Sequence, residues 1–421
     1  MIEKGFFTKI DEKFSLRISK DSNEEFIKIL KLNVLVHGEE IKDYIKRIYK
    51  DHPKKKDILW FYIENNDTGQ IISSLTLMPL EWQFEGLILP VCEMGFVGTL
   101  KEYRGKRLIS KLNEFYERVM MERGYLLSCL RGIPYYYRRF GYDFVLSLDE
   151  RFLLSPNQIP PMELSHIDIR KASRKDIGYI ENQYNLNSNA FLISNSFDTE
   201  SFYFKFMNDS FNDNKLSAYI VEQNGNSEGY FLIGMSYDNE VYTIITSQLT
   251  DDQMIKILQF INEFPKIKEK NDLNLHISEF SEFGKYLFSI GGKLLSNYGW
   301  QIKIPNLKRF FESIKVVLEN RVEESEFNNL SKTVIISDYK QSIELTFVKG
   351  KIEYIKIESG YPDVEKCDVR IPEAMLLKLL LGDRTIEEIN YIVKDARINP
   401  SSKKLIEVLF PKVNSIPDTY Y

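Results

Sequence analysis

Apolar positions in the first 150 residues follow two spacings, one typical of strands and one of helices. A helix is predicted after Ser22, a favourable N-cap, and a second helix is predicted to end near Arg123, with Gly124 as its stop. Runs of β-branched, aromatic and other apolar residues predict strands at Phe14 to Ile18, Ile58 to Ile63, Ile71 to Met78, Val91 to Leu100 and Tyr125 to Leu130. The order is strand, helix, several strands, helix, strand, short helix and strand, which indicates a mixed α/β (α+β) layer fold.

A second segment, 151–300, opens with prolines typical of a linker and then repeats a weaker version of this order. Its predicted strands are 167–170, 217–222, 229–237 and 241–246, with helices near Asp176 and over 252–264. The second helix opens on the acidic run Thr250-Asp251-Asp252-Gln253. If this segment is a repeat of the first, it has lost any anion site at that helix.

The third segment, 301–421, differs from both. Strands at 343–348 and 351–357 flank Lys349-Gly350, a hairpin signal. A helix is predicted from Pro372 to Leu381, with Gly382 as its cap. Its apolar residues are expected to pack in the core: Met375, Leu376, Leu379 and Leu380. The predicted domains are therefore 1–150, 151–300 and 301–421.

Composition narrows the functional classes. The 421 residues are 43% hydrophobic and 28% charged, as in globular proteins, and the length suggests two or three domains. The net charge of −5 provides no basic field for nucleic acid and mildly favours cationic substrates. There is no signal-peptide pattern and no apolar stretch long enough for a membrane helix. We expect a cytoplasmic protein with neither a nucleic-acid nor a membrane partner.

The three cysteines, Cys92, Cys129 and Cys367, are far apart in the sequence and form no CxxC pair. This spacing argues against a disulfide framework and against a zinc site, so no metal is expected. Cys129 is interpreted as core packing. Cys92 could lie near the acyl site, but a nucleophilic role for it has little support. The four histidines match no catalytic spacing and are interpreted as surface or structural residues.

The run Tyr103-Arg104-Gly105-Lys106-Arg107-Leu108 stands between the strand ending at Leu100 and the second predicted helix. A tight basic turn at a helix start gathers backbone N–H groups and the positive end of the helix dipole at one point. This arrangement suits an anion such as a pyrophosphate. Solvated surface charge is the alternative interpretation of the turn by itself.

About thirty residues later, the run 135–142 places three tyrosines, two arginines, Phe140, Gly141 and Tyr142 just after a strand. The strand, basic turn, helix, strand and Tyr-x-x-x-Gly-Tyr pattern together resemble the GNAT superfamily of N-acetyltransferases. The resemblance implies that acetyl-CoA is a co-substrate whose pantetheine arm lies along a splayed strand and whose pyrophosphate binds the turn. It also implies that Tyr137 is the general acid that protonates the departing thiolate.

The family pattern maps onto this chain residue by residue. The pantetheine arm would contact Val97, Gly98 and Thr99, and Gly132 and Ile133 would close the far side of the site. The pyrophosphate loop and first helical turn would be formed by Gly105, Lys106, Arg107, Leu108, Ile109 and Ser110. The chain departs from the pattern at Arg107, where the family has glycine or alanine. An inward side chain there would block the phosphates, and an outward one would not.

Tyrosine suits the acid role because its pKa of about 10 keeps it protonated at neutral pH and near the thiol pKa of about 8.5. Tyr135, Tyr136 and Tyr142 are interpreted as packing residues.

A more specific resemblance covers the whole chain. Tandem GNAT segments followed by a sterol-carrier-protein-like domain characterise the enhanced-intracellular-survival (Eis) family, which acetylates amines of aminoglycosides and of lysines. Local agreement includes Trp300-Gln301-Ile302-Lys303-Ile304, taken to open the third domain, and Leu409-Phe410-Pro411. The resemblance implies that the terminal carboxylate, here that of Tyr421, acts as base. It also implies a homo-oligomer, with a hexamer as one option.

Alternatives remain at this point. Glu93 could be the base, acting through water, although an outward carboxylate on an edge strand is the favoured interpretation of that residue. A different tandem-GNAT acyltransferase, with a longer acyl or an aminoacyl donor, would share the motifs. A non-catalytic lipid- or ligand-binding protein would share the fold.

Overall fold

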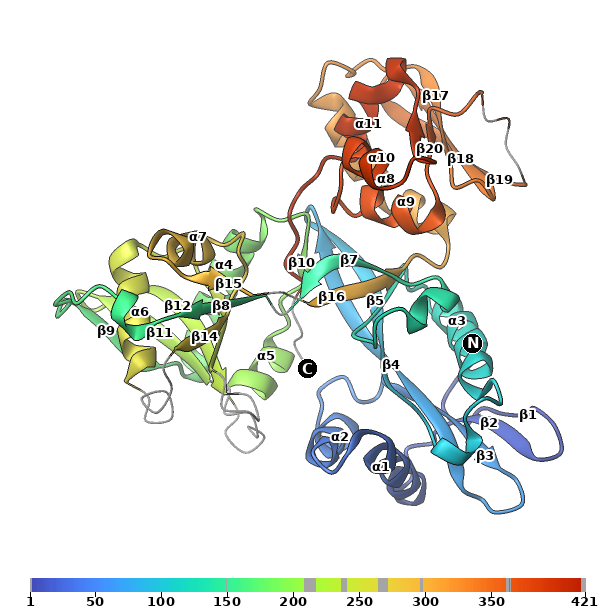
Figure 1. The fold of residues 1–421 in the computed structure, drawn as a ribbon, viewed down its shortest axis with the longest axis horizontal. Coiled ribbons are helices and arrows are strands. Elements are labelled where there is room, and N and C mark those ends of the chain that lie inside the picture. Colours follow the sequence, from blue (N-terminus) through green and yellow to red (C-terminus); the bar gives the residue numbers. More distant parts are fainter. Residues whose placement is uncertain are drawn as a thin grey trace.

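The computed structural model describes residues 2–148, 150–207, 217–235, 241–263, 272–295, 298–360, 363 and 365–417. Three lobes correspond roughly to the three segments and meet around one short strand, β16 (Tyr298–Lys303) (Figure 1). The mixed α/β class expected from the sequence is confirmed. Among the described residues, no helix is long and apolar enough to cross a membrane.

The first segment builds most of a nine-stranded sheet. Its own strands are β1 (Phe7–Lys9), β2 (Phe14–Ile18), β3 (Leu59–Asn65), β4 (Ile71–Phe84), β5 (Leu87–Thr99), β6 (Leu127–Leu130) and β7 (Asp143–Leu148). Its helices are α1 (Asn23–His37), α2 (Ile41–Lys50) and α3 (Leu108–Glu122), with short 3₁₀ helices η1 (Lys101–Tyr103) and η2 (Tyr136–Phe140). Ser22 and Glu25 form a capping box that starts α1 at the predicted place.

Two strands from elsewhere complete this sheet. β16 lies between β6 and β7, and β10 (Ile193–Asn195) pairs with the end of β4. The sequence placed residues 300–304 at the opening of the third domain, whereas the pairing puts their strand inside the first sheet. The domain boundaries themselves stay a prediction.

The second segment forms two smaller sheets. Its strands are β8 (Arg151–Leu154), β9 (Ile167–Lys171), β11 (Ser217–Gln223), β12 (Asn226–Met235), β13 (Val241–Thr246), β14 (Leu273–His276) and β15 (Lys293–Leu294). Its helices are α4 (Ile177–Ser188), α5 (Thr199–Phe206), α6 (Asp251–Asn262) and α7 (Glu282–Ser289), with 3₁₀ turns η3 (Pro156–Gln158) and η4 (Arg174–Asp176). The Thr250 side chain caps α6 beside two acidic residues, so the start of this helix does not suit an anion.

The third segment is a five-stranded sheet with helices. Its strands are β17 (Lys332–Ser337), β18 (Gln341–Val348), β19 (Lys351–Ser359), β20 (Val369–Arg370) and β21 (Arg397–Ile398). Its helices are α8 (Leu307–Glu323), α9 (Glu373–Leu380), α10 (Ile386–Ile392) and α11 (Lys403–Leu409), with the turn η6 (Pro400–Ser402). The predicted hairpin at Lys349-Gly350 and the apolar face of α9 are confirmed.

The long β4–β5 hairpin joins two hydrophobic cores. One end packs with α1, α2 and α3, while Trp82 and Phe84 at the other end share a core with Trp300 and the third segment. Arg321 of α8 also forms an ion pair with Glu85 at the hairpin tip. The strand that carries the candidate site is thus anchored in two lobes (Figure 1).

Candidate active site

β5 loses one of its two neighbours halfway along its length. It pairs with β4 as far as Thr99, but with β6 only at Val91, Cys92 and Glu93. Thr76 pairs with Gly95 and Ser74 with Gly98, so two residues of β5 oppose one of β4. This is a β-bulge, a device common beside active sites. Beyond Glu93, the described strands therefore leave one backbone edge of β5 available to a ligand.

The residues expected to contact the pantetheine arm lie at and after this bulge. A Cβ on Gly98 would come 2.9 Å from Cγ1 of Val36, so glycine allows α1 to pack closely on the strand. The Gly98 carbonyl accepts a hydrogen bond from Ser73 Oγ at 3.0 Å, and Thr99 Oγ1 lies 2.8 Å from the same hydroxyl. These bonds fix the strand, and the residue before them, Val97, lies within the bulge.

The basic turn follows directly and starts α3. Gly105 has φ +80°, and Arg107, the N-cap of α3, has φ 58° and ψ 25°. The Arg107 side chain makes no capping hydrogen bond to the helix. In the described part of the chain no acceptor lies within hydrogen-bond distance of the backbone N–H groups of Leu108, Ile109 and Ser110. The turn is therefore a cationic helix start with unpaired donors, which suits a phosphate.

The conformation of Arg107 explains why the family pattern has a small residue there. A left-handed backbone costs an L-residue about 1 kcal/mol, whereas glycine adopts it freely. The Arg107 side chain is exposed, as are those of Arg104 and Lys106. Lys106 Nζ lies 4.8 Å from the centre of the Tyr103 ring, and Arg104 Nε donates to the Thr99 carbonyl at 3.3 Å.

Tyr137 lies in η2 and is 7% exposed. Its ring contacts those of Tyr136 and Tyr142, with centroids 5.1 and 6.3 Å away. Burial raises the pKa of Tyr137 above its usual value, with smaller contributions from Tyr136 and Tyr298. No hydrogen-bond partner for its hydroxyl occurs among the described residues. The phenol is therefore protonated and free to donate.

Gly132 contacts this ring directly. A Cβ on Gly132 would lie 2.1 Å from Tyr137 Cε2, so only glycine lets the ring rest on the backbone. Ile133, predicted with Gly132 to close the site, is 66% exposed, and Tyr135 is 77% exposed. The packing interpretation is thus wrong for Tyr135, whose ring lies beneath the Arg138 guanidinium, 5.6 Å from its centroid. The packing interpretation holds for Tyr142, which is buried.

Glu93 is not the outward edge carboxylate that the sequence favoured. β5 lies between β4 and β6 at this residue, and Glu93 is 2% exposed. Its Oε1 accepts from Arg131 Nε at 3.1 Å, and its Oε2 has no partner among the described residues. Burial raises the pKa of Glu93, and Arg131 opposes the rise. The result is a buried carboxylate at the point where β5 and β6 part.

Three residues of this site were missed by the sequence analysis: Arg131, Tyr298 and Gln301. Tyr298 and Gln301 both donate to the Gly132 carbonyl, with Gln301 Nε2 at 2.6 Å. The sequence analysis noted the run 300–304 as the opening of the third domain, and its pairing with β6 was not predicted. No spacing rule places residue 301 beside residue 132.

Tyr421 lies outside the described residues, which end at Pro417. The preceding tail is ordered by pairing with β10: Ile416 N donates to the Ile193 carbonyl at 2.8 Å. The Pro417 carbonyl accepts from Trp300 Nε1 at 2.7 Å. The Arg131 guanidinium lies over the Trp300 ring, 5.8 Å from the ring centroid. The tail therefore approaches the ion pair of Arg131 and Glu93.

The cysteines near the site are buried and support the core. Cys92 Sγ lies 3.2 Å from Tyr116 OH, and Ser128 Oγ links that hydroxyl to Tyr142 OH at 2.8 and 2.7 Å. Burial raises the pKa of the Cys92 thiol to about 12. Cys129 is also buried, as expected. Among the described residues, no group of three or more His, Cys, Asp or Glu side chains could hold a metal ion.

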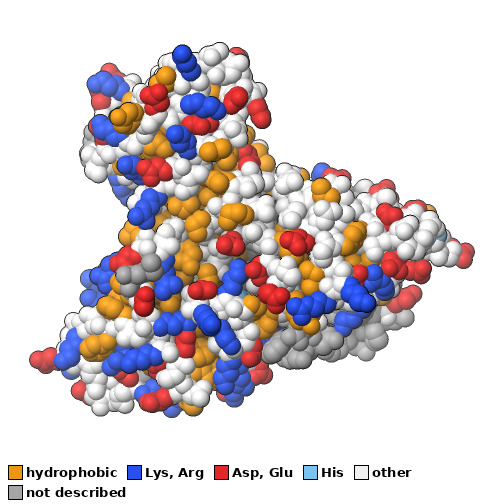
Figure 2. Space-filling view, turned by 180° about the vertical axis from the view of Figure 1, so that it is seen from behind, with side chains coloured by type: hydrophobic (Ala, Val, Ile, Leu, Met, Phe, Trp, Pro, Cys, Tyr) orange, Lys and Arg blue, Asp and Glu red, His pale blue; other side chains and the backbone are white. Residues whose placement is uncertain are grey.

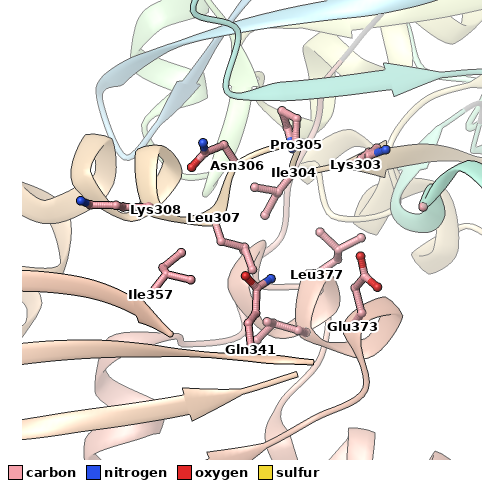
Figure 3. A pocket seen from close by; sticks show the side chains of 12 residues that line it. Lys303, Ile304, Pro305, Asn306, Leu307, Lys308, Gln341, Ile357, Glu373 and Leu377 are labelled. Atoms are coloured by element: carbon pink, nitrogen blue, oxygen red, sulfur yellow. The ribbon is translucent and has the colours of Figure 1, made fainter. Parts of the chain in front are cut away.

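A cavity of about 400 Å³ lies where β16 leads into the third segment (Figure 3). Lys303 and Pro305 line it from the connecting strand, and Gln341, Glu373 and Leu377 from the third segment. Apolar side chains also gather on the surface where the third lobe meets the rest (Figure 2). The cavity includes Gly141, at the end of the helix that carries Tyr137.

Comparison with known proteins agrees with this geometry. Residues 17–145, which contain the bulge, the basic turn and Tyr137, match the family described as acetyltransferase (GNAT) domain. This part of the chain is similar in sequence to GNAT acetyltransferase domains. No curated protein matches the sequence.

Solved structures resemble nearly the whole chain in fold, not only residues 17–145. A probable N-acyltransferase from Enterococcus faecalis, described as a conserved protein of unknown function, has a TM-score of 0.74 at 15% identity, covering 97% of this chain and 100% of that one. A GCN5-related N-acetyltransferase from Anabaena variabilis has a TM-score of 0.69 at 12% identity, covering 96% of this chain and 99% of that one. Eis1 from Mycobacterium abscessus has a TM-score of 0.63 at 11% identity, covering 96% of this chain and 98% of that one. At these identities, the likeness shows a shared fold.

Proposed function

We propose that the protein is an acetyl-CoA-dependent N-acetyltransferase that transfers the acetyl group directly to a primary amine. The observation that carries the proposal is the presence, within residues 17–145, of an open β5 edge, an uncapped cationic start of α3 and the hydroxyl of the largely buried Tyr137. The first suits the pantetheine amides, the second the pyrophosphate, and the third the leaving sulfur.

The proposed reaction moves one acetyl group to the amine and one proton to the base. The substrate ammonium gives a proton to a base, and the free amine then attacks the thioester carbonyl carbon, forming the C–N bond. The Val97 N–H, in the bulge, stabilises the negative charge that develops on the oxygen. The C–S bond breaks, and Tyr137 gives its proton to the thiolate. The bonded nitrogen then returns its surplus proton to the Tyr137 phenolate, which leaves a neutral amide, the CoA thiol and a restored phenol.

Burial of the site does not prevent proton transfer from Tyr137 to the thiolate, because it affects the pKa values of both groups. It raises the pKa of Tyr137, which by itself would make the phenol a weaker acid. Burial raises the pKa of a thiol in the same way, as the value of about 12 for nearby Cys92 illustrates. A thiolate released in such surroundings is a correspondingly stronger base, so proton transfer from Tyr137 stays feasible.

The terminal carboxylate of Tyr421 is the proposed base. The described tail supports this assignment because Pro417 is hydrogen-bonded to Trp300, which contacts Arg131. Glu93 is the alternative, favoured by its burial, its raised pKa and the oxygen without a partner. Adding one glycine after Tyr421 moves the terminal carboxylate and should abolish turnover. Full activity of the extended chain would assign the base to Glu93.

The proposed acceptors are primary amines of aminoglycoside-like molecules, polyamines or lysine side chains, consistent with the net charge of −5. The second lobe, whose α6 start is capped and acidic, would shape the acceptor cavity as a degenerate GNAT domain. The third lobe would act as a sterol-carrier-protein-like support for a homo-oligomer.

Two measurements test the proposal. Calorimetry should show acetyl-CoA binding to the full chain; absence of binding at millimolar cofactor would leave only a non-catalytic role. Release of CoA thiol should be faster with acetyl-CoA than with longer acyl-CoAs in the presence of an amine. A preference for a longer acyl chain would reassign the enzyme to another acyltransferase class.

A further inference from the structure

The loop that carries Tyr137 is bound at both ends by one strand from a distant part of the sequence. At its start, the Gly132 carbonyl accepts hydrogen bonds from Gln301 and Tyr298 of β16. At its end, the Phe140 carbonyl accepts from Lys303 Nζ at 2.8 Å. Lys303 also forms an ion pair with Glu117 of α3 at 2.6 Å. β16 thus fixes loop 132–140 against the helix that begins at the basic turn.

Gln301 is the best placed of these residues to set the position of the phenol. It is 1% exposed, and its backbone pairs with Leu130 on one side and Phe144 on the other. The side-chain amide of Gln301 therefore extends from a fixed backbone position. It donates a hydrogen bond to the carbonyl of Gly132, whose Cα supports the Tyr137 ring. A shift of the Gly132 peptide would move the surface on which the ring rests.

We propose that Gln301 is a positioning residue for the acid: by binding the Gly132 carbonyl, it holds the Tyr137 ring where its hydroxyl meets the leaving sulfur. Tyr298 and Lys303 complete the attachment of the loop. The inference rests on the proposed function, because it assigns Gln301 an effect through Tyr137. It also gives the junction between the second and third segments an indirect part in catalysis, since β16 lies there.

The test replaces Gln301 by methionine, which keeps the side-chain length and removes the donor. Gln301→Met should lower kcat roughly 10- to 100-fold, as expected for a misplacement of up to about 1 Å, and leave KM for acetyl-CoA within about twofold. Lys308→Met is the matched control. Lys308 lines the cavity beside β16 and lies 3.8 Å from Glu312, without contacting the loop, so its loss should not change kcat.

A double-mutant cycle separates positioning from a general structural role. In the Tyr137→Phe background, Gln301→Met should change the residual kcat less than twofold, because the acid it positions is gone. An equal loss of kcat in both backgrounds, or a loss confined to KM, would overturn the inference while leaving Tyr137 as the acid. Wild-type turnover by Tyr137→Phe alone would instead overturn the proposed acid. If Gln301→Met does not fold, Tyr298→Phe removes the other donor to the same carbonyl and enters the same cycle.

Discussion

Replacing Gly132 by alanine tests how the acid is supported. The added Cβ would lie 2.1 Å from Tyr137 Cε2, 2.4 Å from Cδ2 and 2.6 Å from Leu130 Cδ1. Non-bonded carbons rest at roughly 3.5 Å, so the ring or the loop must move by about 1.4 Å. A misplacement of about 1 Å costs roughly 100-fold in rate. We therefore expect kcat to fall about 100-fold.

The assay is steady-state release of CoA thiol with a saturating amine, accompanied by a melting curve. Overpacking should cost about 1–3 kcal/mol of stability, so the variant stays folded at moderate temperature. Gly178→Ala is the control, because no described atom outside its own helical turn and chain neighbours lies within 4 Å of the Cβ position, and α4 favours alanine over glycine.

Two results would refute the reasoning. If folded Gly132→Ala turned over within about threefold of the wild type, the ring would not need its support on the backbone. If KM for acetyl-CoA rose while kcat stayed constant, Gly132 would contact the cofactor, as the sequence predicted, rather than position Tyr137.

Three further predictions follow from the described contacts. Arg107→Gly should stabilise the turn by up to about 1 kcal/mol, yet weaken binding of acetyl-CoA and not of acetyl-pantetheine, which has no phosphate; equal calorimetric losses for both would contradict a phosphate role. Burial lowers the pKa of His52 to about 4, so its contribution to stability is complete above pH 6.5 and is lost as the pH falls through 4. In urea titrations, His52→Gln should therefore lose about 2 kcal/mol less than the wild type between pH 7 and pH 5, whereas parallel losses would show that folding does not lower the pKa of His52. Cys92, buried with its pKa raised to about 12, should not react with a thiol reagent at pH 8; rapid labelling of this residue in the folded protein would contradict the described core.

Local signals predicted much of the fold. The strand Phe14–Ile18 and the helix after Ser22 agree with the structure because alternation and a capping box are encoded by neighbouring residues. The sequence ended one strand at Met78 and began the next at Val91, while β4 and β5 extend to Phe84 and from Leu87. Pro79 lies beyond the last residue of β4 that pairs with β3, so β5 is the one strand that pairs with it there among the described residues.

The candidate site was only partly accessible from the sequence. The basic turn and Tyr137 are recognisable because their residues are close together in the chain. The burial of Glu93 depends on its pairing with β6, and its partner Arg131 lies 38 residues away. The support of Gly132 by Gln301 joins residues 169 positions apart. Such contacts arise from the tertiary fold and cannot be predicted from the periodicity of the sequence.

Amine-dependent release of CoA thiol by the wild type and by Tyr137→Phe, measured beside acetyl-CoA affinity, tests the central claim most directly. The account predicts that thiol release requires both acetyl-CoA and a primary amine. It also predicts that Tyr137→Phe loses most of the turnover while binding acetyl-CoA as tightly as the wild type. Equal turnover by the two proteins, or no amine-dependent release by the wild type with any primary amine of the proposed classes, would contradict it.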